Sequence, residues 1–98
     1  MNNSKIEKGD ILVSVWGYSM TIVNWYKVVD TTPKMVKLQE IGSKVVSGDG
    51  QEGWAMPDES YTEGEIITRK NKDGQVKINS SEYAEKWDGK AVYFSYLD

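Results

Sequence analysis

Residues 14–29, "SVWGYSMTIVNWYKVV", decide the fold class, because they crowd β-branched and aromatic side chains around a single glycine. Such side chains favour strands, and Gly17 can take the positive φ angle that a sharp bend requires. The segment predicts one strand over residues 11–16 and a second over residues 21–29. Apolar residues occupy both faces of the second strand, so one face needs the core and the other a further layer or a partner.

The chain beyond residue 29 also carries mostly strand signals. An alternating pattern predicts a strand over residues 35–41, with Val36 and Leu38 inward, and a short strand follows around Val45. Residues 54–65 are acidic with aromatic side chains interleaved, and are expected to be extended without regular pairing. The Asp73-Gly74 pair predicts a hairpin between residues 65–69 and 75–79, and the last strand covers residues 90–97.

In one segment, the spacing of the apolar residues changes from that of a strand to that of a helix. In residues 80–87, Tyr83 and Trp87 are four apart, and Asn79 or Ser80 can cap a helix that Asp88-Gly89 would end. Short strands spaced about ten residues apart, with this one short helix in the C-terminal half, predict a mainly β fold. We expect a small, partly open barrel of the SH3-like kind, with the OB-like barrel as its rival. It would form a single domain over residues 1–98, in which residues 1–8 are frayed.

Composition removes several kinds of chemistry. The chain has no histidine and no cysteine, so it cannot build a Ser-His-Asp triad, a Cys-His pair or an ordinary zinc site. Carboxylate, lysine and tyrosine chemistry remain. We expect no catalytic activity, no metal and no cofactor.

Charge and hydropathy argue against two classes of partner. Twelve basic and 15 acidic residues give a net charge of -3, so the chain lacks the global positive field of a protein drawn to nucleic acid. No apolar run approaches the roughly 18 residues that span a bilayer, and the first residues lack the apolar stretch of a signal peptide. We therefore expect a cytoplasmic protein that does not bind membranes.

The aromatic and acidic residues are the candidate binding residues. Exposed Trp and Tyr side chains are typical interface anchors, although they also fill small cores. Acidic side chains beside them would suit a basic protein partner. The predicted binding residues are Trp16, Tyr18, Trp25, Trp54, Glu59, Tyr61 and Glu63. A rival surface combines the basic residues of the second hairpin with Tyr93 or Tyr96, and would bind nucleic acid through Arg69, Lys70, Lys72 and Lys77.

Four short motifs give the chain a family resemblance. They are Gly9-Asp10-Ile11, Ser14-Val15-Trp16-Gly17-Tyr18, Tyr26-Lys27-Val28 and, at residues 81–90, "SEYAEKWDGK". With Thr21, they resemble the pattern of a group of small proteins encoded by phages and other mobile elements. Met20 departs from that pattern, which usually has a polar amide there. The resemblance implies a phage or mobile-element origin and a compact β fold, and it brings no established activity.

These observations together predict a function. We expect a non-enzymatic accessory protein that binds and blocks a host protein, such as a nucleic-acid-handling defence factor, in the manner of an anti-CRISPR inhibitor. The alternative is an SH3-like or OB-like nucleic-acid-binding module. Self-association through the aromatic second strand stays open.

Overall fold

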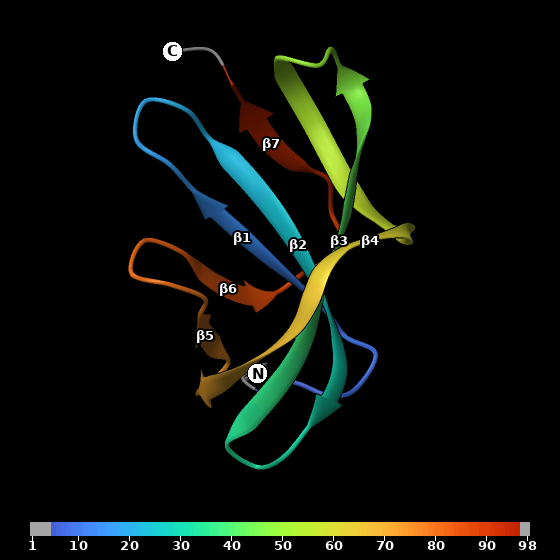
Figure 1. Cartoon of the computed structure of the whole chain (residues 1–98). Helices are drawn as coiled ribbons and strands as arrows, with labels where there is room; N and C mark the ends of the chain where they lie inside the picture. The colour runs from blue at the N-terminus through green and yellow to red at the C-terminus, as the bar shows by residue number, and fades with distance from the viewer. Residues whose placement is uncertain (1–4, 97–98) are drawn as a thin grey trace.

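The computed structural model describes residues 5–96, which form one seven-stranded antiparallel sheet (Figure 1). The strands are β1 (Ile11–Trp16), β2 (Ile22–Thr31), β3 (Met35–Gly48), β4 (Glu52–Lys72), β5 (Gln75–Lys77), β6 (Tyr83–Lys86) and β7 (Val92–Ser95). Their order is β3-β2-β1-β6-β5-β4-β7. An additional pairing of β3 with β4 closes the strands from β1 through β6 into a ring. The expected mainly β, barrel-like fold is confirmed.

The predicted helix over residues 80–87 is wrong. Residues 79–82 form a turn in which the N–H of Ile78 donates to the carbonyl of Glu82 at 2.8 Å, and β6 follows. Burial alternates with period two, because Glu82 and Ala84 are buried while Tyr83 and Glu85 are exposed. β6 pairs with both β1 and β5, so pairing on its two edges outweighs the local helical pattern.

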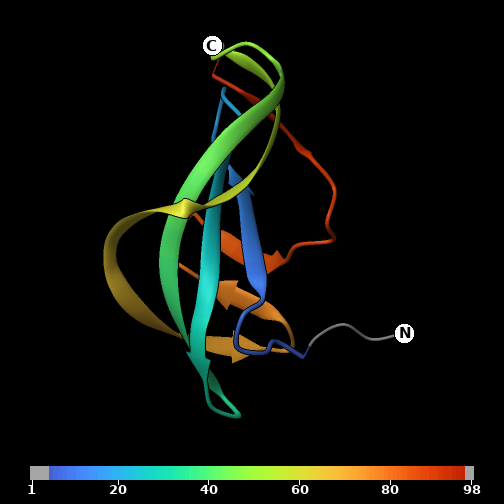
Figure 2. The same ribbon diagram turned by 90° about the vertical axis from the view of Figure 1, so that its right-hand side faces the viewer.

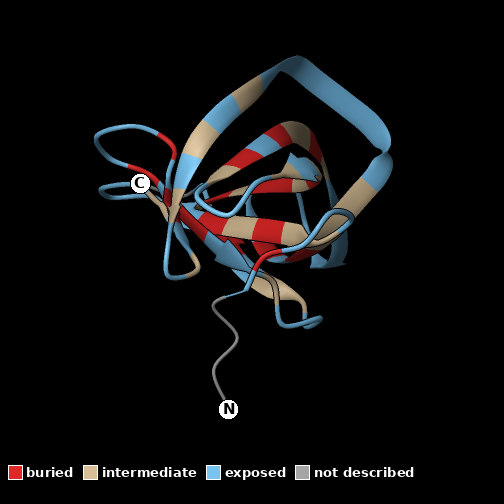
Figure 3. Cartoon of the chain, turned by 90° about the horizontal axis from the view of Figure 1, so that it is seen from below, coloured by how far each residue is buried: buried red, intermediate tan, exposed pale blue. Residues whose placement is uncertain are grey.

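Both faces of β2 are covered from within the chain. Tyr26 and Val28 point into the ring, where they join a core with Leu12 and Leu38. Trp25 points the other way, into a second core completed by side chains from β3, β4 and β7, which are Ile41, Ala55 and Phe94. Seen from below, buried residues gather at the centre of the ring and exposed residues lie on its outside (Figure 3). Two internal cores thus explain the apolar side chains on both faces of β2.

β3 and β4 form the long hairpin that links the two cores (Figure 2). Residues 54–65 were expected to be extended without regular pairing, but β4 pairs with β3 along this stretch, with register shifts. Beyond the ring, β7 pairs with the start of β4, and an isolated bridge between Thr21 and Ser95 connects it back to β2. β7 therefore closes the second core.

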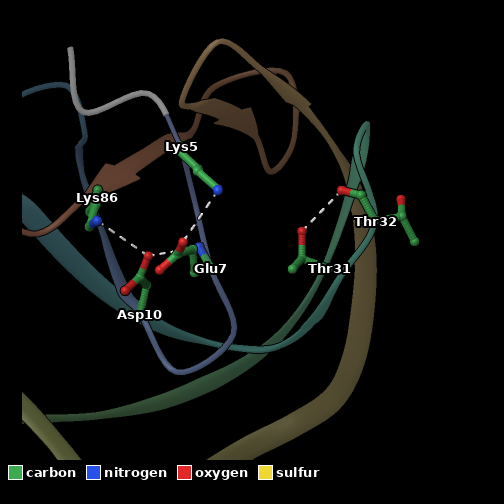
Figure 4. Close-up of polar contacts among 6 residues, drawn as sticks. All are labelled: Lys5, Glu7, Asp10, Thr31, Thr32 and Lys86. Atoms are coloured by element: carbon green, nitrogen blue, oxygen red, sulfur yellow. Dashed lines mark hydrogen bonds and ion pairs between the residues drawn. The ribbon is translucent and has the colours of Figure 1, made fainter.

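The N-terminal segment was expected to be frayed over residues 1–8. Residues 1–4 lie outside the described residues. Among residues 5–8, Ile6 is 4% exposed and belongs to the ring core, whereas Lys5, Glu7 and Lys8 are exposed. The Asp10 carboxylate accepts the N–H of Glu7 at 2.8 Å and lies 3.4 Å from Nζ of Lys86 on β6 (Figure 4). The ion pair between Asp10 and Lys86 holds the N-terminal segment against β6.

Within residues 5–96, no helix is long and apolar enough to span a membrane.

Candidate functional site: an acidic cleft beside the β4 bulge

A bulge in β4 creates the cleft. In the pairing of β3 with β4, Ile41 faces Thr62 but the next residue, Gly42, faces Asp58, so residues 59–61 are extra on the β4 side. The Asp58 carboxylate accepts the N–H of Ser60 at 3.0 Å, which fixes the shape of the bulge. Extra residues in one strand bend it and re-aim its side chains, and here they leave a hollow between β2, β3 and β4.

Gly42 allows the bulge to close over β3. A Cβ atom at this position would lie 3.1 Å from both Cβ and Cδ2 of Tyr61, which is tighter than ordinary van der Waals contact. The Tyr61 side chain therefore lies across the glycine, and it remains 55% exposed. The aromatic ring of Tyr61 forms one wall of the cleft.

The cleft has a volume of about 290 Å³ and a mixed lining. Its apolar floor comes from the second core, and Tyr61 and Tyr96 add aromatic rings. Three carboxylates also line it, from Glu40, Asp58 and Glu63. In the part of the chain that the structure describes, none of these three carboxylates forms an ion pair with a lysine or arginine.

The carboxylate of Glu40 is partly buried among other negative charges. Its pKa is raised, first because burial disfavours the charged form and then because Glu63 and Glu82 repel its charge. The pKa of Asp58 is lowered, mainly by hydrogen bonds from the hydroxyl and the N–H of Ser60. A positive charge placed in the cleft would relieve the repulsion at Glu40, so the site favours a cation.

A buried carboxylate supports the cleft from the inside of the ring. Glu82 is 3% exposed, and its Oε2 accepts hydrogen bonds from Ser14 Oγ at 2.7 Å, Tyr26 OH at 2.7 Å and Asn24 Nδ2 at 3.1 Å. Asn24 also lines the cleft, so this network fixes one of its walls. The four residues hold the turn before β6 against β1 and β2.

The structure divides the predicted binding residues among separate places. Tyr61 and Glu63 line the cleft, and Glu59 lies next to it in the bulge, where its carboxylate is 2.7 Å from Nζ of Lys27. Trp25 is fully buried, and its indole N–H donates to Ser43 Oγ at 3.1 Å. Trp25 also lines the cleft, so its role as a binding residue stays a prediction, although a buried side chain offers a partner little surface.

The remaining predicted residues lie away from the cleft. Residues 43–57, where β3 and β4 pair beyond the bulge, form the outer β3–β4 hairpin. Trp54 lies on this hairpin, is 46% exposed and packs edge-on against Tyr93, with ring centroids 5.7 Å apart. Tyr18 is fully exposed in the loop between β1 and β2. Trp16 is partly buried at the end of β1, and its indole nitrogen has no hydrogen-bond partner among residues 5–96. None of these three side chains lines the cleft.

The predicted binding residues did not include Asn24, Glu40, Asp58 and Tyr96, which also line the cleft. For Glu40 a signal exists, because period two from Val36 and Leu38 places it on the inward face of β3. Asn24 and Tyr96 gave no comparable signal, since their positions depend on how β2 and the end of the chain meet.

The described residues contain no group of three or more His, Cys, Asp or Glu side chains placed to hold a metal ion. No protein-family model, curated protein or solved structure matches the chain.

Proposed function

We propose that this chain is a non-enzymatic accessory protein of a phage or mobile element, and that it binds a basic surface of a host protein and blocks it stoichiometrically. The observation that carries the proposal is the cleft of about 290 Å³, lined by three carboxylates that form no salt bridge within residues 5–96. Buried or crowded carboxylates are normally paired. A lysine or arginine from a partner would complete the site.

The lining of the cleft suits such a side chain. The carboxylates can accept hydrogen bonds from its charged head, and an arginine can bind one of them through two parallel bonds. Its head can also lie over the ring of Tyr61, because cations are attracted to aromatic faces. The exposed Trp54–Tyr93 pair offers a second, apolar contact on the outer hairpin.

The expected partner class is a nucleic-acid-handling defence factor, whose groove is basic because it binds phosphate. An acidic protein can occupy such a groove in place of the nucleic acid. The net charge of -3 is too small for a full mimic of DNA, so the role rests on the acidic cleft itself. Within the proposal we keep the SH3-like class of small barrel, with the OB-like barrel as its alternative.

The test begins with affinity capture from the host, followed by titration of the purified partner. The wild-type protein should inhibit that partner at a one-to-one molar ratio, without turnover. Glu63→Lys should weaken the complex by about tenfold or more, since it places a cation beside the partner's own. Glu65→Lys is the matched control, because Glu65 is exposed on the same strand and does not line the cleft.

Equal weakening by the two lysine variants would show that general charge, and not the cleft, governs binding. Multiple turnovers that disappear on changing one carboxylate would overturn the non-enzymatic part of the proposal.

A further inference from the structure

A second groove, basic in character, lies on the outside of the ring, where the end of β4 pairs with β5 and β5 pairs with β6. Its volume is about 590 Å³, within the range of sites that hold small ligands. The lining includes four cationic residues and one exposed aromatic ring: Arg69, Lys70, Lys72, Lys77 and Tyr83.

Strand register explains why the three lysines share a face. Lys70 and Lys72 are two residues apart on β4, and Lys72 pairs with Gln75 on β5. Lys77 is two residues beyond Gln75 and pairs directly with Tyr83 on β6. Side chains two apart on a strand, or directly opposite across a pair, point to the same side of a sheet. The alternate residues Val76 and Ala84 are fully buried inside the ring.

The lysines of this groove are free to bind an anion. Within residues 5–96, Lys70, Lys72 and Lys77 form no ion pair. Arg69 is different, because its Nε donates to the carbonyl of Ile78 at 2.9 Å and braces the groove wall. Three unpaired ammonium groups on one face of a chain with net charge -3 form a local positive field.

Tyr83 adds a stacking surface. Its side chain is 45% exposed, and Nζ of Lys77 lies 6.0 Å from the ring centroid, at the outer limit of a cation–π contact. The sequence had suggested Tyr93 or Tyr96 for this role, but Tyr93 packs against Trp54 and Tyr96 against Phe94. The aromatic residue beside the lysines is Tyr83.

We propose that this groove binds single-stranded nucleic acid, with Lys70, Lys72 and Lys77 on the phosphates and one base stacked on Tyr83. Unpaired bases expose their faces to an aromatic ring, whereas the bases of a duplex are already stacked on one another. This combination of a basic groove with an exposed ring therefore favours a single strand. The site is separate from the acidic cleft and does not depend on the function proposed above.

The test is fluorescence anisotropy with a labelled oligothymidine of about 12 nucleotides, a length within the usual range for small barrels. Because each phosphate contact on a single strand contributes about -0.7, the plot of log affinity against log salt should have a slope of about -2. Replacing any one of the three lysines by alanine should reduce the size of that slope by about 0.7. Lys44→Ala, on the outer part of β3, should leave it unchanged.

Stacking is tested separately. Tyr83→Ala should weaken binding about tenfold and Tyr83→Phe should preserve it, since stacking needs the ring and not the hydroxyl. Glu85 pairs with Gln75 on the same face, so Glu85→Gln should strengthen binding roughly twofold by removing a repulsive charge.

Three results would overturn the proposal: no binding by the folded wild type at low ionic strength, equal salt slopes for the lysine variants and the wild type, or equal affinity for a duplex with no effect of Tyr83→Ala. Glu63→Lys should leave oligothymidine binding undiminished. A Glu63→Lys variant that no longer binds the host partner but still binds the oligonucleotide would show that the two sites are separate.

Discussion

The hydroxyl group of Tyr26 donates a hydrogen bond of 2.7 Å to Oε2 of Glu82, and both side chains are buried inside the ring. The two residues are 56 positions apart in the chain. Their contact fixes the turn before β6 against β2, and it raises the pKa of Tyr26, first through burial and then through the bond to Glu82. It connects the barrel interior with the wall of the acidic cleft, because Asn24 donates to the same carboxylate oxygen.

Removing this hydroxyl should destabilise the fold. Tyr26→Phe leaves the buried carboxylate with one donor fewer, and we expect a loss of about 1–3 kcal/mol in the free energy of unfolding, measured by urea denaturation. Tyr61→Phe is the control, because its side chain is exposed and the change should stay within about 0.5 kcal/mol. Equal effects of the two changes would contradict the structural role of the buried bond.

Replacement of Trp25 should strongly lower the free energy of unfolding, because Trp25 is a core residue. Trp25→Ala empties the centre of the second core, where its ring also packs edge-on against Trp87 at 5.5 Å, and should cost about 3–5 kcal/mol. Trp54→Ala should cost less than about 1 kcal/mol, since Trp54 is half exposed. Thermal unfolding followed by circular dichroism checks both, and a reversed order would place Trp25 outside the core.

The outer β3–β4 hairpin should depend on Gly53. A Cβ atom there would meet the carbonyl oxygen of Ser47 at 2.1 Å and Cα of Gly48 at 3.0 Å, both of which belong to the backbone. Gly53→Ala should therefore lower stability by about 1–3 kcal/mol. In the same hairpin, a Cβ atom at Gly50 would meet nothing within 4 Å, so Gly50→Ala should be tolerated. The difference in melting temperature between these two variants is the measurement.

The raised pKa of Glu40 predicts a pH dependence of stability. Because the folded state holds this proton more tightly than the unfolded chain, stability should fall as pH rises from the ordinary value of 4.5 through the raised pKa. Glu40→Gln removes that loss, so it should raise the melting temperature at neutral pH and have little effect well below pH 4.5. A constant difference between variant and wild type across this range would show that the Glu40 charge is not the cause.

Some features of this protein follow from local sequence. The first strand lies at residues 11–16 as its β-branched residues predict, and Val36 and Leu38 are buried as the alternation of β3 predicts. The Asp73-Gly74 turn joins β4 to β5, and both residues have positive φ angles, of 54° and 90°. These features depend on side chains and backbone preferences within a few residues, so the local sequence predicts them directly.

Other features arise only where distant segments meet. Residues 80–87 have the spacing of a helix, but β1 and β5 each supply a strand edge, and pairing on both edges outweighs local propensity. The acidic cleft requires the β4 bulge to meet β2 and β3, and the basic groove requires Tyr83 to pair with Lys77 across two strands. The sequence by itself determined a β-rich chain and its turns, whereas non-local strand pairing decided which charges and rings lie together, because register sets the face on which each side chain points.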